Sequence, residues 1–162
     1  MINHLSQRVH AVLFMAFFVC INSFSTMAQT NASPNWQEWN EGYEKAVKEN
    51  KIILVDAYTD WCGWCKKMDR DTYAKPEIIE FIGKHFVPIK FNPEIKDRKY
   101  KIDGQEYSGE QLYHILTQGN STGFPTTYYL YPAKKKLFFD SGYKGPADFM
   151  EVLKSAVEED KK

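Results

Sequence analysis

Two cysteines separated by two residues lie between a short apolar run and a run of helix-forming residues, and this feature constrains the fold most strongly. Residues 52–58 before the motif are apolar over a length typical of a buried strand, and residues 66–70 after it favour a helix. A Cys-x-x-Cys motif at such a junction is typical of a thiol–disulfide redox centre. Cys62 would lie at the helix N-terminus, where unpaired backbone N–H groups favour its thiolate. Cys65 would follow about one turn later, close enough to resolve a mixed disulfide formed by Cys62.

Other uses of a close cysteine pair fit this sequence less well. A structural zinc site needs about four ligands, and completing one would require His85 and His114, whose spacing matches no zinc-finger pattern. Haem attachment requires a histidine directly after the second cysteine, where this chain has Lys66. A purely structural disulfide that closes so small a loop would add little stability. The motif therefore predicts redox chemistry, with no metal and no cofactor.

Residues 1–28 have the character of a secretory signal peptide. Arg8 precedes an apolar stretch over residues 11–21, which is short for a bilayer span, and small and polar residues then lead to a cleavage site before Gln29. We expect Cys20 to be removed with this segment. The alternative is a retained N-terminal anchor.

The remaining residues, 29–162, number 134 and are enough for one domain with one core. Their 20 basic and 21 acidic residues leave a net charge near −1, which does not favour a nucleic acid or an acidic membrane surface as partner. Their only cysteines are Cys62 and Cys65. Because small secreted domains that rely on disulfides for stability usually have several, a single close pair favours disulfide exchange.

The rest of the chain predicts an alternation of helices and strands around the motif. A capping signal at Asn35 and Glu38 predicts a first helix, with Trp36 and Trp39 on its apolar face. Asp103 before a glycine predicts a short hairpin. The proline in the strand 86–91 suggests that one edge of this strand is not fully paired. The other predicted elements are, in order, a strand 52–58, helices 62–72 and 76–86, a hairpin 99–107, a helix 108–116, strands 126–131 and 136–141 that form a hairpin, and a helix 146–157.

This order of elements, with the redox pair after the first strand and a proline before the third, resembles the thioredoxin fold. Residues 36–157 are similar to the exported thioredoxin-like thiol–disulfide oxidoreductases, and the specific matches are the motif at 61–66, Asp56, residues 124–126 and Gly142. The resemblance implies an α/β fold with a central mixed sheet of four to five strands flanked by helices. An extra N-terminal helix and a small hairpin insertion would complete it.

The resemblance also implies roles for residues outside the cysteine pair. Asp56 matches a buried acid that accepts a proton from the second cysteine, and burial would raise its pKa. The alternative is an aspartate at a strand margin that faces water. Pro125 matches a proline that is cis in the family, and the backbone before it would pair with an extended substrate. The substrate-binding residues implied are Trp61, Gly63, Trp64, Phe124, Pro125 and Gly142. The alternative for the three aromatic residues among them is ordinary packing.

The function expected is that of an exported, most simply periplasmic, enzyme that reduces or isomerises protein disulfides through Cys62 and Cys65. We expect disulfide-bearing protein substrates, a membrane-bound electron donor, no nucleic acid, no membrane insertion after signal cleavage, and a monomer. Trp64 stands where thioredoxin itself has proline, so the potential of thioredoxin cannot be transferred. Because no cation lies between the cysteines, we expect a reductant or mild isomerase rather than a strong oxidant. The alternative is a copper- or peptide-binding module, although copper sites of this kind need an added histidine or methionine.

Overall fold

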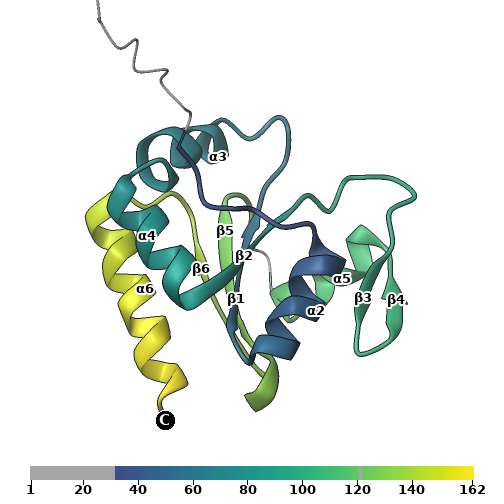
Figure 1. The fold of residues 1–162 in the computed structure, drawn as a ribbon. Helices are drawn as coiled ribbons and strands as arrows, with labels where there is room; N and C mark the ends of the chain where they lie inside the picture. The colour runs from purple at the N-terminus through teal and green to yellow at the C-terminus, as the bar shows by residue number, and fades with distance from the viewer. Residues whose placement is uncertain (1–31, 121) are drawn as a thin grey trace, which may run out of the picture. The chain divides into compact units, whose positions relative to one another are not determined.

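The computed structural model describes residues 32–120 and 122–162, which form a mixed four-stranded sheet with helices on both faces (Figure 1). The strands are β1 (Ile52–Ala57), β2 (Phe86–Phe91), β5 (Thr126–Tyr131) and β6 (Lys136–Ser141), in the order β2-β1-β5-β6. β1 pairs in parallel with β2 and antiparallel with β5, and β5 and β6 form an antiparallel hairpin. All six residues of β1 are buried because the strand is central and covered on both faces.

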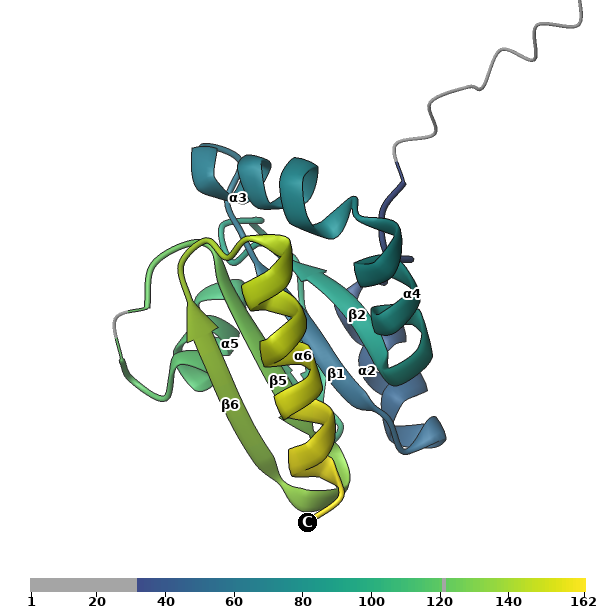
Figure 2. The ribbon, with the colours of Figure 1, turned by 90° about the vertical axis from the view of Figure 1, so that its left-hand side faces the viewer.

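The helices divide between the two faces of the sheet (Figures 1 and 2). α2 (Trp39–Glu49) and α5 (Gly109–Thr117) cover one face, and α4 (Pro76–His85) and α6 (Pro146–Asp160) cover the other. α3 (Gly63–Met68) follows β1 and continues into a single π-helical turn, η1 (Asp69–Tyr73). A 3-10 turn, η2 (Pro132–Lys134), joins β5 to β6.

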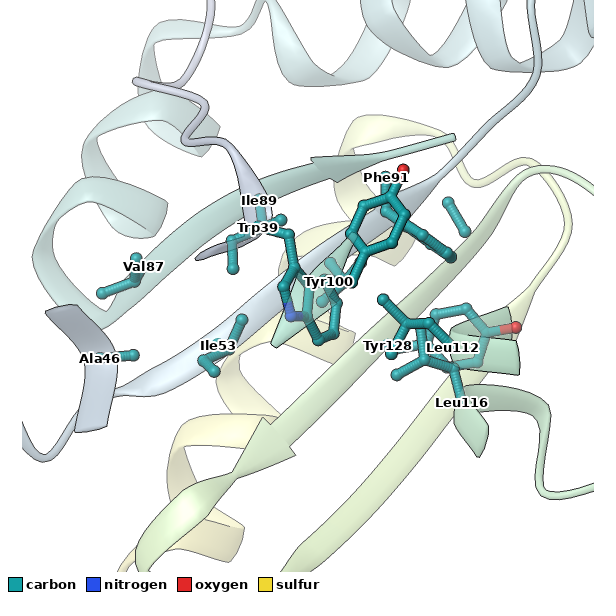
Figure 3. Packing of buried hydrophobic residues seen from close by; sticks show 12 residues of the cluster. Trp39, Ala46, Ile53, Val87, Ile89, Phe91, Tyr100, Leu112, Leu116 and Tyr128 are labelled. Atoms are coloured by element: carbon teal, nitrogen blue, oxygen red, sulfur yellow. The ribbon is translucent and has the colours of Figure 1, made fainter. Parts of the chain in front are cut away.

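Aromatic residues fill much of the core on the α2 face. Trp39, Phe91 and Tyr100 pack against one another, with ring centroids 5.1–6.3 Å apart (Figure 3). They join side chains from β1, β2, β5 and α5 in one buried cluster. A second cluster on the opposite face contains Tyr73 and Phe149, whose rings meet edge to face.

The predicted hairpin insertion is present as β3 (Tyr100–Ile102) and β4 (Gln105–Tyr107). Asp103 and Gly104 form its turn with φ values of 48° and 82°, the positive values that favour an Asp-Gly pair. The hairpin is held to α2 by the Trp39 indole N–H, which donates to the Lys101 carbonyl at 3.0 Å. The capping box predicted for the following helix is also confirmed at Ser108 and Gln111.

The prediction for the start of the first helix is wrong. α2 begins at Trp39, and Gln37 before it lies beside the outer edge of β2, where its N–H donates to the Pro88 carbonyl at 2.8 Å. Trp36 belongs to the cluster on the α4 face, whereas Trp39 belongs to the cluster on the α2 face. In a helix, the side chains of residues 36 and 39 would lie on the same side. The segment before α2 is instead extended and carries the two indoles to opposite faces of the sheet.

The predicted α/β architecture is confirmed, with four strands in the central mixed sheet and the extra N-terminal helix in place. The predicted signal peptide, residues 1–28, lies outside the described residues. Across residues 32–120 and 122–162, no helix combines the length and the apolar character needed to cross a membrane.

Candidate active site

Cys62 and Cys65 form a disulfide at the start of α3. Cys62 is the N-cap residue, and its Sγ accepts a hydrogen bond from the backbone N–H of Cys65 at 3.0 Å. This position points the unpaired N–H groups of the first helical turn toward the Cys62 sulfur. The cysteines are only 4% and 3% exposed, so exposure does not distinguish them in the disulfide state. What distinguishes them is their position relative to the helix start.

Two exposed tryptophans border the disulfide. Trp61 is 68% exposed and Trp64 is 59% exposed, which is unusual for side chains of this size. Trp64 lies beside the Tyr143 ring at 5.6 Å, and Gly63 between the cysteines is exposed as well. Ordinary core packing therefore does not account for either tryptophan, and together they present apolar surface beside the sulfurs.

The orientation of Trp61 is set by a hydrogen bond that the sequence pattern did not reveal. Its indole N–H donates to the Glu94 carboxylate, with distances of 3.0 and 3.2 Å to the two oxygens. The same indole meets the Phe124 ring edge to face, with centroids 6.0 Å apart. Glu94 lies in the loop between β2 and β3, 33 residues away in sequence, so no local signal could have identified it.

The segment before β5 contains the proline singled out in the sequence. The Phe124–Pro125 peptide bond is cis, and Pro125 is buried. Phe124 is half-buried, stacked on Tyr113 of α5 at 5.3 Å. The Pro125 carbonyl accepts a hydrogen bond from the Gly142 N–H at 2.8 Å. Gly142 has a φ of 88°, where any other residue type would be strained.

Asp56 lies in β1 with 1% of its surface exposed, so the alternative of an aspartate that faces water is wrong. Burial raises its pKa because water no longer solvates the anion, while the neighbouring Lys90 ammonium acts in the opposite direction and only partly offsets burial. Lys90 Nζ lies 2.5 Å from Asp56 Oδ2. Asp56 Oδ1 has no hydrogen-bond partner among the described residues. The carboxyl group is thus easier to protonate than an ordinary aspartate.

Lys90 is a second ionisable residue of this region that the sequence interpretation missed. It stands directly opposite Asp56 in the parallel pairing of β1 and β2. Its Nζ also lies 2.5 Å from Oδ1 of Asp69, the first residue of η1. The same ammonium is 4.9–5.5 Å from the ring centres of three aromatic residues, Trp36, Tyr58 and Tyr73. The one available signal was a lysine inside an otherwise apolar strand, since such a charge needs a partner.

The site combines a disulfide-bonded cysteine pair with a buried carboxyl group in the preceding strand. The cysteine pair lies at a helix N-terminus, exposed tryptophans precede Cys62 and Cys65, and the pKa of the Asp56 carboxyl group in the preceding strand is raised. The part of the chain that the structure describes contains no group of three or more histidine, cysteine, aspartate or glutamate side chains arranged to hold a metal ion.

Comparison with known proteins identifies a matching family model and several relatives. A family model described as Thioredox_DsbH, a protein of unknown function (DUF255), matches residues 21–159. The disulfide bond reductase DsbH of Chlamydia pneumoniae is 26% identical over 130 residues, which cover 78% of this chain and 74% of that protein.

Other relatives extend the comparison. A thioredoxin H-type of Fagopyrum esculentum is 44% identical over 92 residues, covering 57% of this chain and 74% of that protein. A solved structure of a DsbH oxidoreductase shares the fold at 24% identity with a TM-score of 0.57, covering 78% of this chain and 86% of that one. The match to spermatogenesis-associated protein 20 of Rattus norvegicus is 27% identical over 117 residues, which are only 13% of that protein's length.

Proposed function

Because the chain belongs to the Thioredox_DsbH family and has the cysteine pair of a thioredoxin-like thiol–disulfide oxidoreductase, we propose that it is exported and reduces or isomerises protein disulfides. The observation that carries the proposal is the Cys62–Cys65 disulfide at the N-terminus of α3, bordered by exposed tryptophans. The reductase named among its relatives supports the reducing direction.

The reaction proceeds in two exchanges. The Cys62 thiolate attacks one sulfur of a substrate disulfide, the substrate S–S bond breaks, and the other substrate sulfur leaves as a thiolate that takes up a proton. Cys65 then loses its proton to Asp56 and attacks the Cys62 sulfur. This step releases the second substrate thiolate and forms the Cys62–Cys65 disulfide. Two electrons have passed to the substrate, and a dithiol donor must return them before the next cycle.

The apolar border is the proposed substrate-binding surface. Trp61, Trp64 and Phe124 offer apolar contacts to partly unfolded chains, with Gly63 leaving room for close approach. The backbone before Pro125 would pair with an extended substrate segment, in the manner of an added strand. Gly142 supports that segment through its hydrogen bond to Pro125.

Turnover of insulin disulfides tests the enzymatic proposal against a binding module. With dithiothreitol as electron source, the protein should accelerate insulin reduction, and Cu(I) titration of the reduced protein should give no tight complex. Binding of unfolded peptide without any acceleration would instead favour a peptide-holding module, for which the exposed tryptophans are the favouring observation. Tight copper binding without turnover would favour the copper-handling alternative.

The proposed location is the periplasm of a bacterium, reached through cleavage of residues 1–28. N-terminal sequencing of the mature protein should then begin at Gln29, whereas an intact N-terminus would favour a retained anchor. In an oxidising compartment a reductase must be re-reduced, so the proposed partner is a membrane-bound electron donor. We propose that the protein acts as a monomer with disulfide-bearing proteins as substrates.

The reduction potential should lie at about −200 to −270 mV, in the range of glutaredoxins and thioredoxin. Gly63 and Trp64, the residues between the cysteines, carry no positive charge that would stabilise the reduced form. Lys66 is exposed to solvent, so salt screens its charge. Equilibration against a series of glutathione redox buffers measures this value. A potential above about −150 mV would make the protein a disulfide donor and contradict the reductase direction.

Replacing Asp56 by asparagine should preserve the fold and slow the resolution of mixed disulfides by about 10²-fold at pH 6. Asparagine keeps the shape but cannot take the proton from Cys65. The loss should be smaller at pH 8, where more of the Cys65 thiol ionises without help. Rapid mixing of reduced protein with a mixed-disulfide substrate measures the rate, and parental rates across pH 6–8 would rule out the proton-acceptor role.

A further inference from the structure

We propose that Asp69 is a positioning residue for the proposed reaction: by sharing the Lys90 ammonium with Asp56, it leaves the buried carboxyl group readier to hold a proton. This inference rests on the proposed role of Asp56 as the proton acceptor. Asp69 lies outside the redox motif, four residues after Cys65.

The geometry shows one ammonium group divided evenly between two carboxylates. Lys90 Nζ lies 2.5 Å from Asp56 Oδ2 and 2.5 Å from Asp69 Oδ1. The two aspartates differ strongly in environment, because the side chain of Asp56 is 2% exposed and that of Asp69 is 46% exposed. The Lys90 side chain, at 21%, connects the interior to the surface.

The charges of this cluster do not balance. With both carboxylates ionised, one positive charge faces two negative charges, and one carboxylate is therefore favoured to take up a proton. Water does not solvate the buried Asp56 anion, so the carboxyl group of Asp56 takes up a proton more readily than an ordinary aspartate. If Asp69 were uncharged, Asp56 would have the whole ammonium and would ionise at lower pH.

The pKa directions of the pair agree with this division. Burial is the main cause that raises the pKa of Asp56, and the Asp69 charge adds to it against the opposing effect of Lys90. For Lys90, burial acts to lower the pKa, but the two carboxylates outweigh it and the pKa is raised. The ammonium is thus stabilised by two carboxylates, whereas Asp56 shares the Lys90 charge with Asp69.

The other titratable groups around Asp56 and Lys90 are tyrosines. Tyr58 follows β1, Tyr73 ends η1 and Tyr129 lies in β5. Burial raises the pKa of all three above the ordinary tyrosine value, so they remain neutral at pH 4–9. The Cys62–Cys65 pair does not titrate while it is oxidised. Because the pKa of Lys90 is raised above its ordinary value, Lys90 also keeps its charge over that range, and Asp56 titrates beside a constant positive charge.

An NMR titration of the oxidised protein with ¹³C-labelled aspartate side chains tests the inference without any substrate. In Asp69→Asn, the titration midpoint of the Asp56 carboxyl carbon should fall by about 1 pH unit. Asp69→Glu, which restores the charge, should return it to within about 0.3 pH unit of the parent. Because Asp69 is about half exposed, neither substitution leaves a buried group unpaired.

Asp71→Asn is the matched control. Asp71 lies in the same π-helical turn and is paired with Lys67 and Arg70 rather than with Lys90. The Asp71→Asn substitution removes the same charge from the same segment. If only the net charge of this segment mattered, it would shift the Asp56 midpoint as much as Asp69→Asn does. We expect less than about a third of that shift.

Two outcomes would overturn the inference: an unchanged Asp56 midpoint in Asp69→Asn, or an equal shift in Asp71→Asn. Failure of the proposed function has a different signature, since insulin reduction would then be absent while the Asp56 midpoint still responded to Asp69. Conversely, full activity with an unresponsive midpoint would reject the role of Asp69 alone.

Discussion

Replacing Cys62 by serine should lower the rate of insulin reduction by at least about 10³-fold, because a serine hydroxyl cannot attack a disulfide at neutral pH. Cys65→Ser should also stop turnover, but for another reason. Its Cys62 remains able to attack, so the protein should accumulate as a covalent mixed disulfide with its substrate. Non-reducing electrophoresis and mass spectrometry of the trapped complex distinguish the two variants.

The assignment of roles rests on the helix N-terminus, since exposure does not separate the two cysteines. Alkylation of the reduced protein at pH 6–7 should therefore modify Cys62 first. A Cys20→Ser variant is the control, because that cysteine lies in the proposed signal peptide and should affect neither result. If Cys62→Ser traps substrate and Cys65→Ser does not, the attacking and resolving roles are reversed.

Replacing Lys90 by methionine should destabilise the protein by about 3–5 kcal/mol at pH 8, the cost of leaving a buried charge without its partner. Asp56 cannot be solvated in place of the ammonium, because its side chain is 2% exposed. Lys66→Met, at an exposed position on α3, is the matched control and should change stability by less than about 0.5 kcal/mol.

The pH dependence of this loss identifies its cause. Without Lys90, the pKa of Asp56 in the folded state rises further above the ordinary aspartate value of about 3.9. The folded protein then binds a proton more tightly than the unfolded chain, so its stability falls as pH increases between those two pKa values. The deficit of Lys90→Met should be small near pH 4 and should grow toward pH 8.

Urea unfolding at several pH values measures this deficit. In the double variant Lys90→Met with Asp56→Asn, most of the pH-dependent loss should disappear, because no buried charge remains. A deficit that is the same at pH 4 and pH 8, or that persists in the double variant, would show that Lys90 contributes through packing alone.

The main features of the fold and the redox pair were predictable because their signals are local. A strand, a Cys-x-x-Cys motif and a helix start within about 20 residues specify the position of Cys62 at a helix N-terminus. The Asp103-Gly104 turn and the capping box at Ser108 depend on backbone preferences within four residues. Such patterns act on neighbouring residues and can be recognised without knowing what packs against them.

The tertiary structure decided the features that depend on residues far apart in the chain. The parallel register of β1 and β2 sets Lys90 beside Asp56, 34 residues away, and the π-helical turn brings Asp69 to the same ammonium. The opposite faces occupied by Trp36 and Trp39, the Glu94 contact to Trp61 and the burial of both sulfurs likewise follow from packing. The sequence alone determined that a redox pair begins a helix. Only the folded sheet determined how the buried Asp56 is paired, because that pairing depends on strand register and on the exclusion of water.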